Sequence, residues 1–231
     1  MVCNVITADK ANRLFWLGRY AERVYISLHL LRRYYDKAID GNMSDLNEYY
    51  RCLGGYGAYG DDEESKLAQL YDKENNFSII TSLDRANDNA IVLRHDITSE
   101  SLSYIQMSQV LLDDCASVGE NNITLLQPIT DYMLAFFGSV DERVFNKRIR
   151  KYLKIGKMIE NLDLHVRFNY PFFRIEEVYD TLKTYIKQID VEVNESSLAR
   201  LDEMIQDEVY NPASEQYKDS VVRSLNSLVL V

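Results

Sequence analysis

The chain has 231 residues, of which 46% are hydrophobic and 27% charged, and its formal net charge is −10. This composition is typical of a folded domain with a sizeable core, and it excludes a mainly disordered chain. The acidic balance argues against broad contact with nucleic acid or an anionic membrane, so we expect neither as a partner.

The three cysteines are far apart and lack C-x-x-C spacing, which is typical of a reducing compartment. The start of the chain has no basic region followed by an apolar run, and no segment reaches about 18 apolar residues. These features predict a cytoplasmic protein.

Glycine and proline are scarce, with nine and three residues, and this favours long helices over frequent turns. The clearest helix is predicted at 9–40, because its apolar residues recur in threes and fours. Those residues are Leu14, Leu17, Ala21, Val24, Leu28, Leu31, Tyr35 and Ala38.

Further helices are predicted at 44–53, 77–95, 98–117, 123–137, 141–169, 174–190, 195–210 and 214–229, with Thr98 as an N-cap and Gly138 as a helix end. GGYGAYG at 54–60 is interpreted as a connection, and DDEE at 61–64 as the acidic start of another helix. No strand is predicted. The expected fold is all-α, a single helical bundle forming one domain over 1–231.

Two of the predicted helices resemble each other. LGRYAE in the first aligns with IGKMIE in the helix at 141–169, so that Gly18 matches Gly156 and Glu22 matches Glu160. A glycine inside a helix costs about 1 kcal/mol relative to alanine, so a matched pair indicates close approach of a backbone or a ligand. We therefore predict two long, pseudo-repeated central helices.

The first helix also carries a second, mixed stripe of Phe15, Arg19, Glu22, Ile26 and His29. Charges on a helix packed on two sides must be paired and hydrogen-bonded. Two interpretations remain open: an ion-pair network that fixes helix packing, or a polar pocket in which Glu22 and Glu160 face each other as an acid–base pair.

We predict neither a metal nor another cofactor. A di-metal helical bundle needs Glu-x-x-His, but Glu160 is followed three residues later by Asp163, and His165 comes two residues after that. The other histidines, His29 and His95, fall on separate predicted helices and are interpreted as surface or packing residues. No cysteine or serine has a recognisable neighbouring base.

Three stretches are similar to motifs of the bacterial alpha-E domain family. ANRLFWLGRYAERVY resembles the family's N-terminal signature, A-E-N-L-Y-W-L-G-R-Y-x-E-R-A-E. FSIITSLDRANDNAIVLRHDITSE resembles its central block, and YLKIGKMIENLDLHVRF resembles a later L-R-L-G-R-x-I-E-R-A-D block. Together they span most of 1–170. The chain departs from the family's arginines at Asn87, Ile91, Asn161 and Ala213.

The resemblance implies an all-helical fold and a place in peptide synthesis or modification, because the family is commonly encoded beside an ATP-grasp ligase and a transglutaminase-like peptidase. Those two proteins are the partners that the resemblance suggests. The candidate catalytic residues are Glu22 and Glu160, and the candidate substrate-binding residues are Arg19, Arg23, Arg94, Lys157, Asp163 and Arg167.

Three functional classes follow. The first is an accessory or substrate-handling module whose arginines hold carboxylates or phosphates. The second is an enzyme using the paired glutamates. The third is a structural or protein-interaction bundle, in which the seventeen tyrosines line a partner surface.

Overall fold

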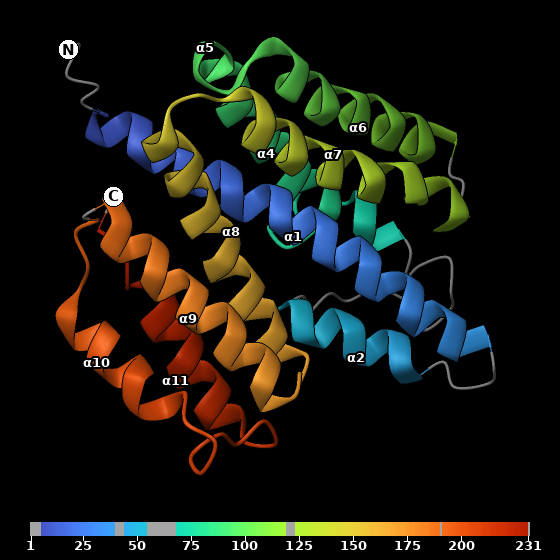
Figure 1. Ribbon diagram of the computed structural model, residues 1–231. Coiled ribbons are helices and arrows are strands. Elements are labelled where there is room, and N and C mark those ends of the chain that lie inside the picture. Colours follow the sequence, from blue (N-terminus) through green and yellow to red (C-terminus); the bar gives the residue numbers. More distant parts are fainter. Residues whose placement is uncertain (1–5, 40–43, 55–67, 119–122, 190, 231) are drawn as a thin grey trace, which may run out of the picture. The chain divides into compact units, whose positions relative to one another are not determined.

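The computed structural model is all-α in the parts of the chain that it describes, which are residues 6–39, 44–54, 68–118, 123–189 and 191–230 (Figure 1). Within these ranges there is no strand, and Val193 and Val229 form an isolated antiparallel bridge. The all-α prediction is confirmed. None of the helices described in these ranges has both the length and the apolar character needed to cross a membrane.

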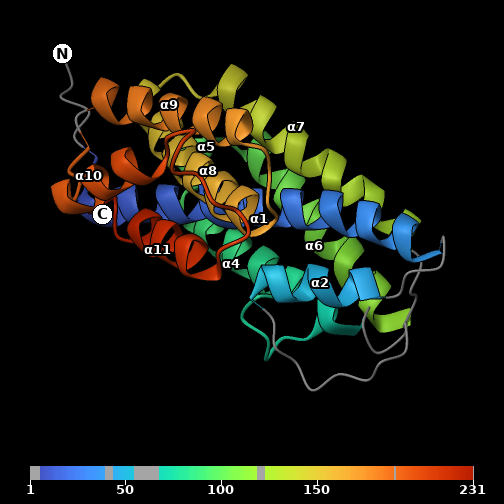
Figure 2. The ribbon, with the colours of Figure 1, turned by 90° about the horizontal axis from the view of Figure 1, so that it is seen from below.

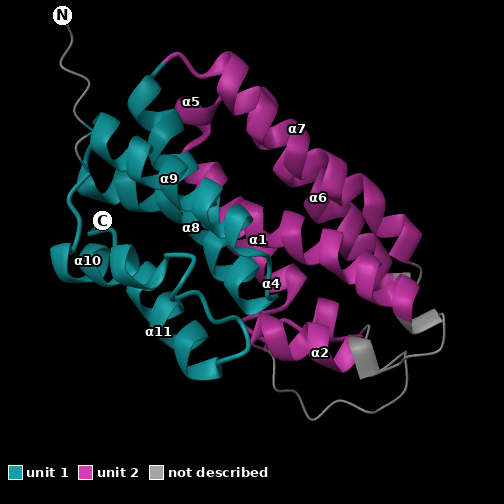
Figure 3. Cartoon of the chain, turned by 60° about the horizontal axis from the view of Figure 1, so that its bottom comes forward, with its two compact units in different colours: residues 1–19, 146–231 teal, residues 20–145 magenta. Residues whose placement is uncertain are grey.

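The chain folds into two compact units (Figure 3). Unit 1 contains Met1–Arg19 and Asn146–Val231, and unit 2 contains Tyr20–Phe145. The first helix, α1 (Ala8–Ile39), therefore contributes its first turns to unit 1 and the remainder to unit 2. The prediction of one domain over 1–231 stays a prediction.

Unit 1 is built on α8, which packs against α9 and α11, while α10 packs on α11 (Figures 1 and 2). The core side of α8 carries Ile155, Ile159, Leu162 and Val166, each at most 1% exposed, with Phe15 of α1 in the same cluster. This spacing of fours and threes places the four side chains on one face of the helix. The helices are α8 (Lys147–Arg167), α9 (Phe172–Ile189), α10 (Glu195–Met204) and α11 (Glu215–Asn226).

The matched glycines lie where the backbones of α1 and α8 meet. A Cβ atom on Gly18 would lie 2.0 Å from the carbonyl oxygen of Leu153, and one on Gly156 would lie 2.0 Å from that of Phe15. Both distances are far inside van der Waals contact, so neither position accepts a side chain without separation of the helices. The predicted close approach at Gly18 and Gly156 is confirmed.

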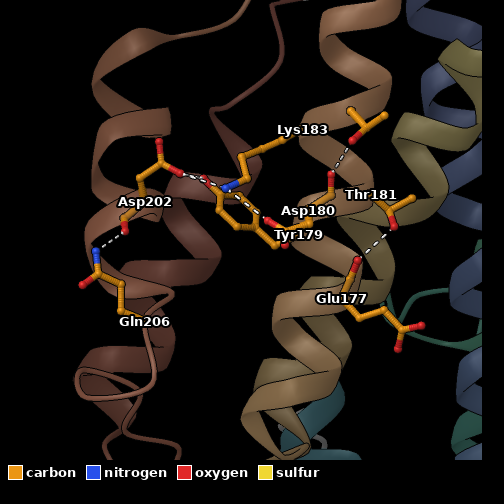
Figure 4. Close-up of polar contacts among 8 residues, drawn as sticks. Glu177, Tyr179, Asp180, Thr181, Lys183, Asp202 and Gln206 are labelled. Atoms are coloured by element: carbon orange, nitrogen blue, oxygen red, sulfur yellow. Dashed lines mark hydrogen bonds and ion pairs between the residues drawn. The ribbon is translucent and has the colours of Figure 1, made fainter.

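A polar cluster joins α9 to α10 (Figure 4). The Tyr179 hydroxyl donates a hydrogen bond of 2.9 Å to Asp202, and the Lys183 ammonium lies 4.5 Å from the centre of the Tyr179 ring. Lys183 also forms ion pairs of 3.2 Å with Asp180 and 3.4 Å with Asp202. Burial, and then the hydrogen bond to Asp202, raise the pKa of Tyr179. The cluster thus fixes a protonated tyrosine between the two helices.

In unit 2, α6 packs against α7 and α4, and the short α5 packs against α4 and α6. Ser78 caps α4, since its side chain accepts a hydrogen bond of 3.1 Å from the Thr81 amide. Thr98 likewise accepts from the Ser101 amide at 3.4 Å, which confirms the predicted cap of α6. The elements are α2 (Ser44–Leu53), η1 (Gln69–Tyr71), α4 (Ile79–Val92), α5 (Arg94–Ile97), α6 (Ser99–Val118), η2 (Ile123–Leu126) and α7 (Gln127–Arg143).

The seam predicted for the first helix is buried from Leu14 to Leu31, whereas Tyr35 is half-buried and the side chain of Ala38 lies outside the described residues. Each of the six seam residues from Leu14 to Leu31 is at most 4% exposed. The heptapeptide at 54–60, apart from Gly54, and the acidic run at 61–64 also lie outside the described residues.

Three predicted boundaries are wrong by more than five residues. The helix predicted at 195–210 ends at Met204. Gly138 does not end its helix, because α7 continues to Arg143, and open space surrounds the glycine there. The next helix begins at Lys147 and not at residue 141, since Asn146 is its N-cap and accepts from the amides of Arg148 at 3.0 Å and Ile149 at 3.5 Å. A glycine weakens a helix by about 1 kcal/mol, which packing of the surrounding turns readily offsets.

Candidate functional site

The central feature of unit 1 is a buried arginine held by three helices. Arg19 Nε donates to Glu160 Oε2 at 2.8 Å, and one of its terminal nitrogens donates to the Asn226 side-chain oxygen at 2.8 Å. The other terminal nitrogen lies 3.7 Å from Asp163 Oδ2. Arg19 is 5% exposed, Glu160 2% and Asp163 1%. The arginine side chain therefore links α1, α8 and α11 out of contact with bulk water.

A second arginine completes the charge balance of this network. Arg167 Nε donates to Asp163 Oδ1, one helical turn away on α8. Two guanidinium groups thus face two carboxylates, and the rings of Trp16 and Phe15 lie 5.0 Å and 5.9 Å from the Arg19 guanidinium carbon. Cation–π contacts and paired charges are what keep a buried guanidinium stable.

The network brings together four of the predicted site residues: Arg19, Glu160, Asp163 and Arg167. Lys157 lies on the same helix, one turn before Glu160, and is half-buried. An arginine carries five N–H donors on three nitrogens, and each nitrogen of Arg19 already faces an acceptor. This geometry favours the ion-pair interpretation, while the substrate-binding roles of these residues stay predictions.

Sequence reasoning missed Asn226, which supplies the acceptor from α11. It lies 207 positions from Arg19 along the chain. No local pattern marks an asparagine at the end of a helix as the partner of a distant arginine, so only the tertiary structure identifies it.

The other predicted residues belong to unit 2. Glu22 is 1% exposed on α1. Arg23 is half-buried, with its guanidinium carbon 5.9 Å from the centre of the Phe77 ring. Arg94 is exposed and donates to the carbonyl of Ile91 at 3.1 Å. Because Glu22 and Glu160 lie in different units, their predicted pairing stays a prediction.

Near Arg23, Tyr49 forms a buried polar contact in unit 2. Its ring is fully buried, and its hydroxyl donates to the carbonyl of Ser27 at 2.9 Å. Burial, followed by the neighbouring Tyr50 hydroxyl, raises the pKa of Tyr49, and the positive charge of Arg23 partly opposes this. The tyrosine is therefore a neutral hydrogen-bond donor that joins α2 to α1.

His165, on α8 beside Asp163 in the sequence, is a packing residue. Its ring stacks on Tyr170 with centroids 4.0 Å apart and an interplanar angle of 11°. Burial, and then the positive charge of Arg174, lower the pKa of His165 from 6.5 to about 4. The folded chain thus holds this imidazole in its neutral form at neutral pH.

This shift predicts a loss of stability in mild acid. Between about pH 6.5 and pH 4 the unfolded chain binds a proton at His165 that the folded chain does not, so the free energy of unfolding falls as the pH falls. Below about pH 4, where the effect is complete, it lowers the free energy of unfolding by about 1–3 kcal/mol. Urea titrations from pH 7 to pH 4 are expected to show a steeper decline for the wild type than for His165→Gln. If the free energy of unfolding falls equally with pH in the wild type and in His165→Gln, the lowered pKa of His165 is contradicted.

The fold and the charged network define an all-α protein in which a buried arginine of the long N-terminal helix is paired with carboxylates of α8. Residues 8–205 match the Alpha-E family, described as "a predicted alpha-helical domain with a conserved ER motif". The chain belongs to the Alpha-E family. Neither a curated protein nor a solved structure gives a match. Glu22 and Arg23 form a Glu-Arg pair within the stretch that resembles the family's N-terminal signature.

Proposed function

We propose that this chain is a cytoplasmic accessory or substrate-handling module in ATP-grasp-linked peptide synthesis or modification in bacteria. Its proposed partners are an ATP-grasp ligase and a transglutaminase-like protein. Membership of the Alpha-E family supports the class of protein, and the resemblance to motifs of that family supports the pathway.

The observation that favours an accessory protein over an enzyme is the state of Arg19. All three of its nitrogens are directed at Glu160, Asp163 and Asn226, and the side chain is 6% exposed. A residue that recognises a substrate keeps donors directed at a cavity, whereas a residue that braces helices uses them internally. The geometry of Arg19 therefore supports a scaffold for binding over a centre for chemistry.

The alternative function is an enzyme in which Glu22 and Glu160 transfer protons. Glu160 is engaged by Arg19 at 2.8 Å and is 2% exposed, so a substrate reaches its carboxylate only if the Arg19 contact opens. This makes the enzyme hypothesis the weaker of the two. The third function is a purely structural, protein-interaction role. Unlike the accessory role, it predicts that the chain has no effect on product formation.

Reconstitution with the proposed ATP-grasp ligase separates the three functions. The accessory hypothesis predicts that product forms only when ligase, ATP and this chain are all present. It further predicts that Glu160→Gln supports the wild-type yield, provided that circular dichroism shows an intact fold.

Loss of product with a fully folded Glu160→Gln protein would favour the enzyme. Arg13→Gln is the control, because Arg13 belongs to the same compact unit as Glu160 but lies on α1 in an exposed ion pair with Asp9. Product formation that is indifferent to the presence of the chain would reject the accessory role.

A further inference from the structure

A cavity of about 440 Å³ lies in unit 1 between α10 and α11, the two helices that pack side by side in Figures 1 and 2. Its volume falls within the range of about 300–1,000 Å³ that is usual for small-molecule sites. Its lining is mostly polar and includes Arg200, Glu203, Arg223 and Ser224, with Met204 as an apolar wall. None of these residues belongs to the charged network around Arg19.

The charges at this cavity are not used by the fold. Among the described residues, the side chains of Arg200 and Glu203 form no hydrogen bond or ion pair. Arg223 donates from Nε to the Asp219 carbonyl of its own helix at 3.1 Å, which leaves its terminal nitrogens available. Two guanidiniums beside one carboxylate give this cavity a net positive charge, on a chain whose net charge is −10.

The hydroxyl of Ser224 adds a preorganised hydrogen-bonding group. The residue is 5% exposed, and within the described part of the chain its hydroxyl makes no hydrogen bond. Ser220 also lines the cavity and donates to the Gln216 carbonyl at 2.8 Å, so its oxygen is left as an acceptor. Both serines lie on α11, which holds them in fixed positions.

The negative groups of the cavity lie at helix C-termini. Glu203 is in the last turn of α10, and the cavity also reaches Ser224 in the last turn of α11. Helix C-termini carry partial negative charge and favour cations. A simple dianion would be attracted by the two arginines but repelled by Glu203 and these helix ends, whereas a molecule with both charges would be matched by both sets of groups.

We propose that this cavity binds a small zwitterion, an amino acid or a short peptide with free amino and carboxyl groups. Arg200 and Arg223 take the carboxylate, with the Ser224 hydroxyl as a further donor, and Glu203 takes the ammonium group. Met204 contacts the aliphatic part. This site is independent of the proposed accessory function, since it is defined by α10 and α11 alone.

Isothermal titration calorimetry of the full chain with the dipeptide alanyl-alanine tests the site. Removing a charge-assisted hydrogen bond weakens binding about tenfold or more, and this is expected for Arg200→Gln, for Glu203→Gln, and for wild type with the N-acetylated or C-amidated dipeptide. Arg148→Gln is the matched control, because Arg148 is exposed in the same unit and does not line the cavity.

Each other outcome overturns the proposal. Absence of heat with the dipeptide at millimolar concentration removes the site, and equal affinity of wild type and both cavity variants places binding elsewhere. If inorganic phosphate binds as tightly as the dipeptide, and Glu203→Gln raises the affinity for phosphate, the cavity is a site for anions and not for zwitterions. Arg200 and Glu203 are exposed, so thermal melts of their variants are expected to match the wild type. No ligase is present, so the result leaves the accessory function to its own test.

Discussion

Alanine at Gly18 or at Gly156 is expected to lower the free energy of unfolding by about 3 kcal/mol, despite the gain in helix propensity. The added Cβ would lie 2.0 Å from the carbonyl oxygen of Leu153 in the first case and of Phe15 in the second. These obstacles are backbone atoms, which cannot rotate away as a flexible side chain can. The helices must separate, and the core around Phe15 and Ile155 loses contact.

Gly138→Ala is the matched control for both changes. Gly138 lies inside α7, and a Cβ there would have no neighbour within 4 Å. With only the helix-propensity term acting, the control is expected to raise the free energy of unfolding by about 0.5–1 kcal/mol. Urea denaturation followed by circular dichroism measures all three variants. Wild-type stability of Gly18→Ala and Gly156→Ala would show that the two backbones do not touch.

The glycine result explains why this part of the fold could be predicted from the sequence. Gly18 and Gly156 each interrupt an otherwise continuous helical pattern, and their flanking residues repeat. Glycine destabilises a helix, so two glycines in matching sequence contexts indicate that a side chain does not fit at either position. Here each glycine leaves room for the backbone of the other helix. Gly138 lacks such a counterpart and meets nothing, which is why its prediction as a helix end failed.

The site was harder to predict, because its members are joined by the tertiary structure. The period of α8 placed Glu160, Asp163 and Arg167 on one helix, and the fold supplied Arg19 as their partner. The sequence also placed Glu22 and Arg23 beside Arg19, yet these residues belong to the other compact unit. Whether they share one site with Glu160 therefore stays a prediction.

Replacing Arg19 by alanine is expected to destabilise the chain by about 3–5 kcal/mol, the usual cost of removing one partner from a buried ion pair. Glu160, which is 2% exposed, loses its 2.8 Å hydrogen bond from Arg19. The side-chain oxygen of Asn226 loses the hydrogen bond that it accepts from Arg19. Asp163 keeps Arg167, so the damage is concentrated on Glu160. Arg19→Lys is expected to fall between wild type and alanine, because an ammonium group cannot reproduce the planar fork.

A double-mutant cycle separates the pair from the packing of the arginine stem. Glu160→Gln in the Arg19→Met background removes the buried charge that Arg19 pairs in the wild type, so the double variant is expected to be more stable than the sum of the single changes by about 1–3 kcal/mol. Arg13→Gln, which breaks the exposed Asp9 pair on the same helix, is expected to change stability by less than about 1 kcal/mol. Strict additivity in the cycle would mean that Arg19 contributes without coupling to Glu160, through its packing on the two aromatic rings and its contacts with Asn226 and Asp163. A positive coupling energy would instead show that the Arg19–Glu160 ion pair stabilises the packing of α1 against α8. Arg19 would then be a structural residue and not a substrate-binding one.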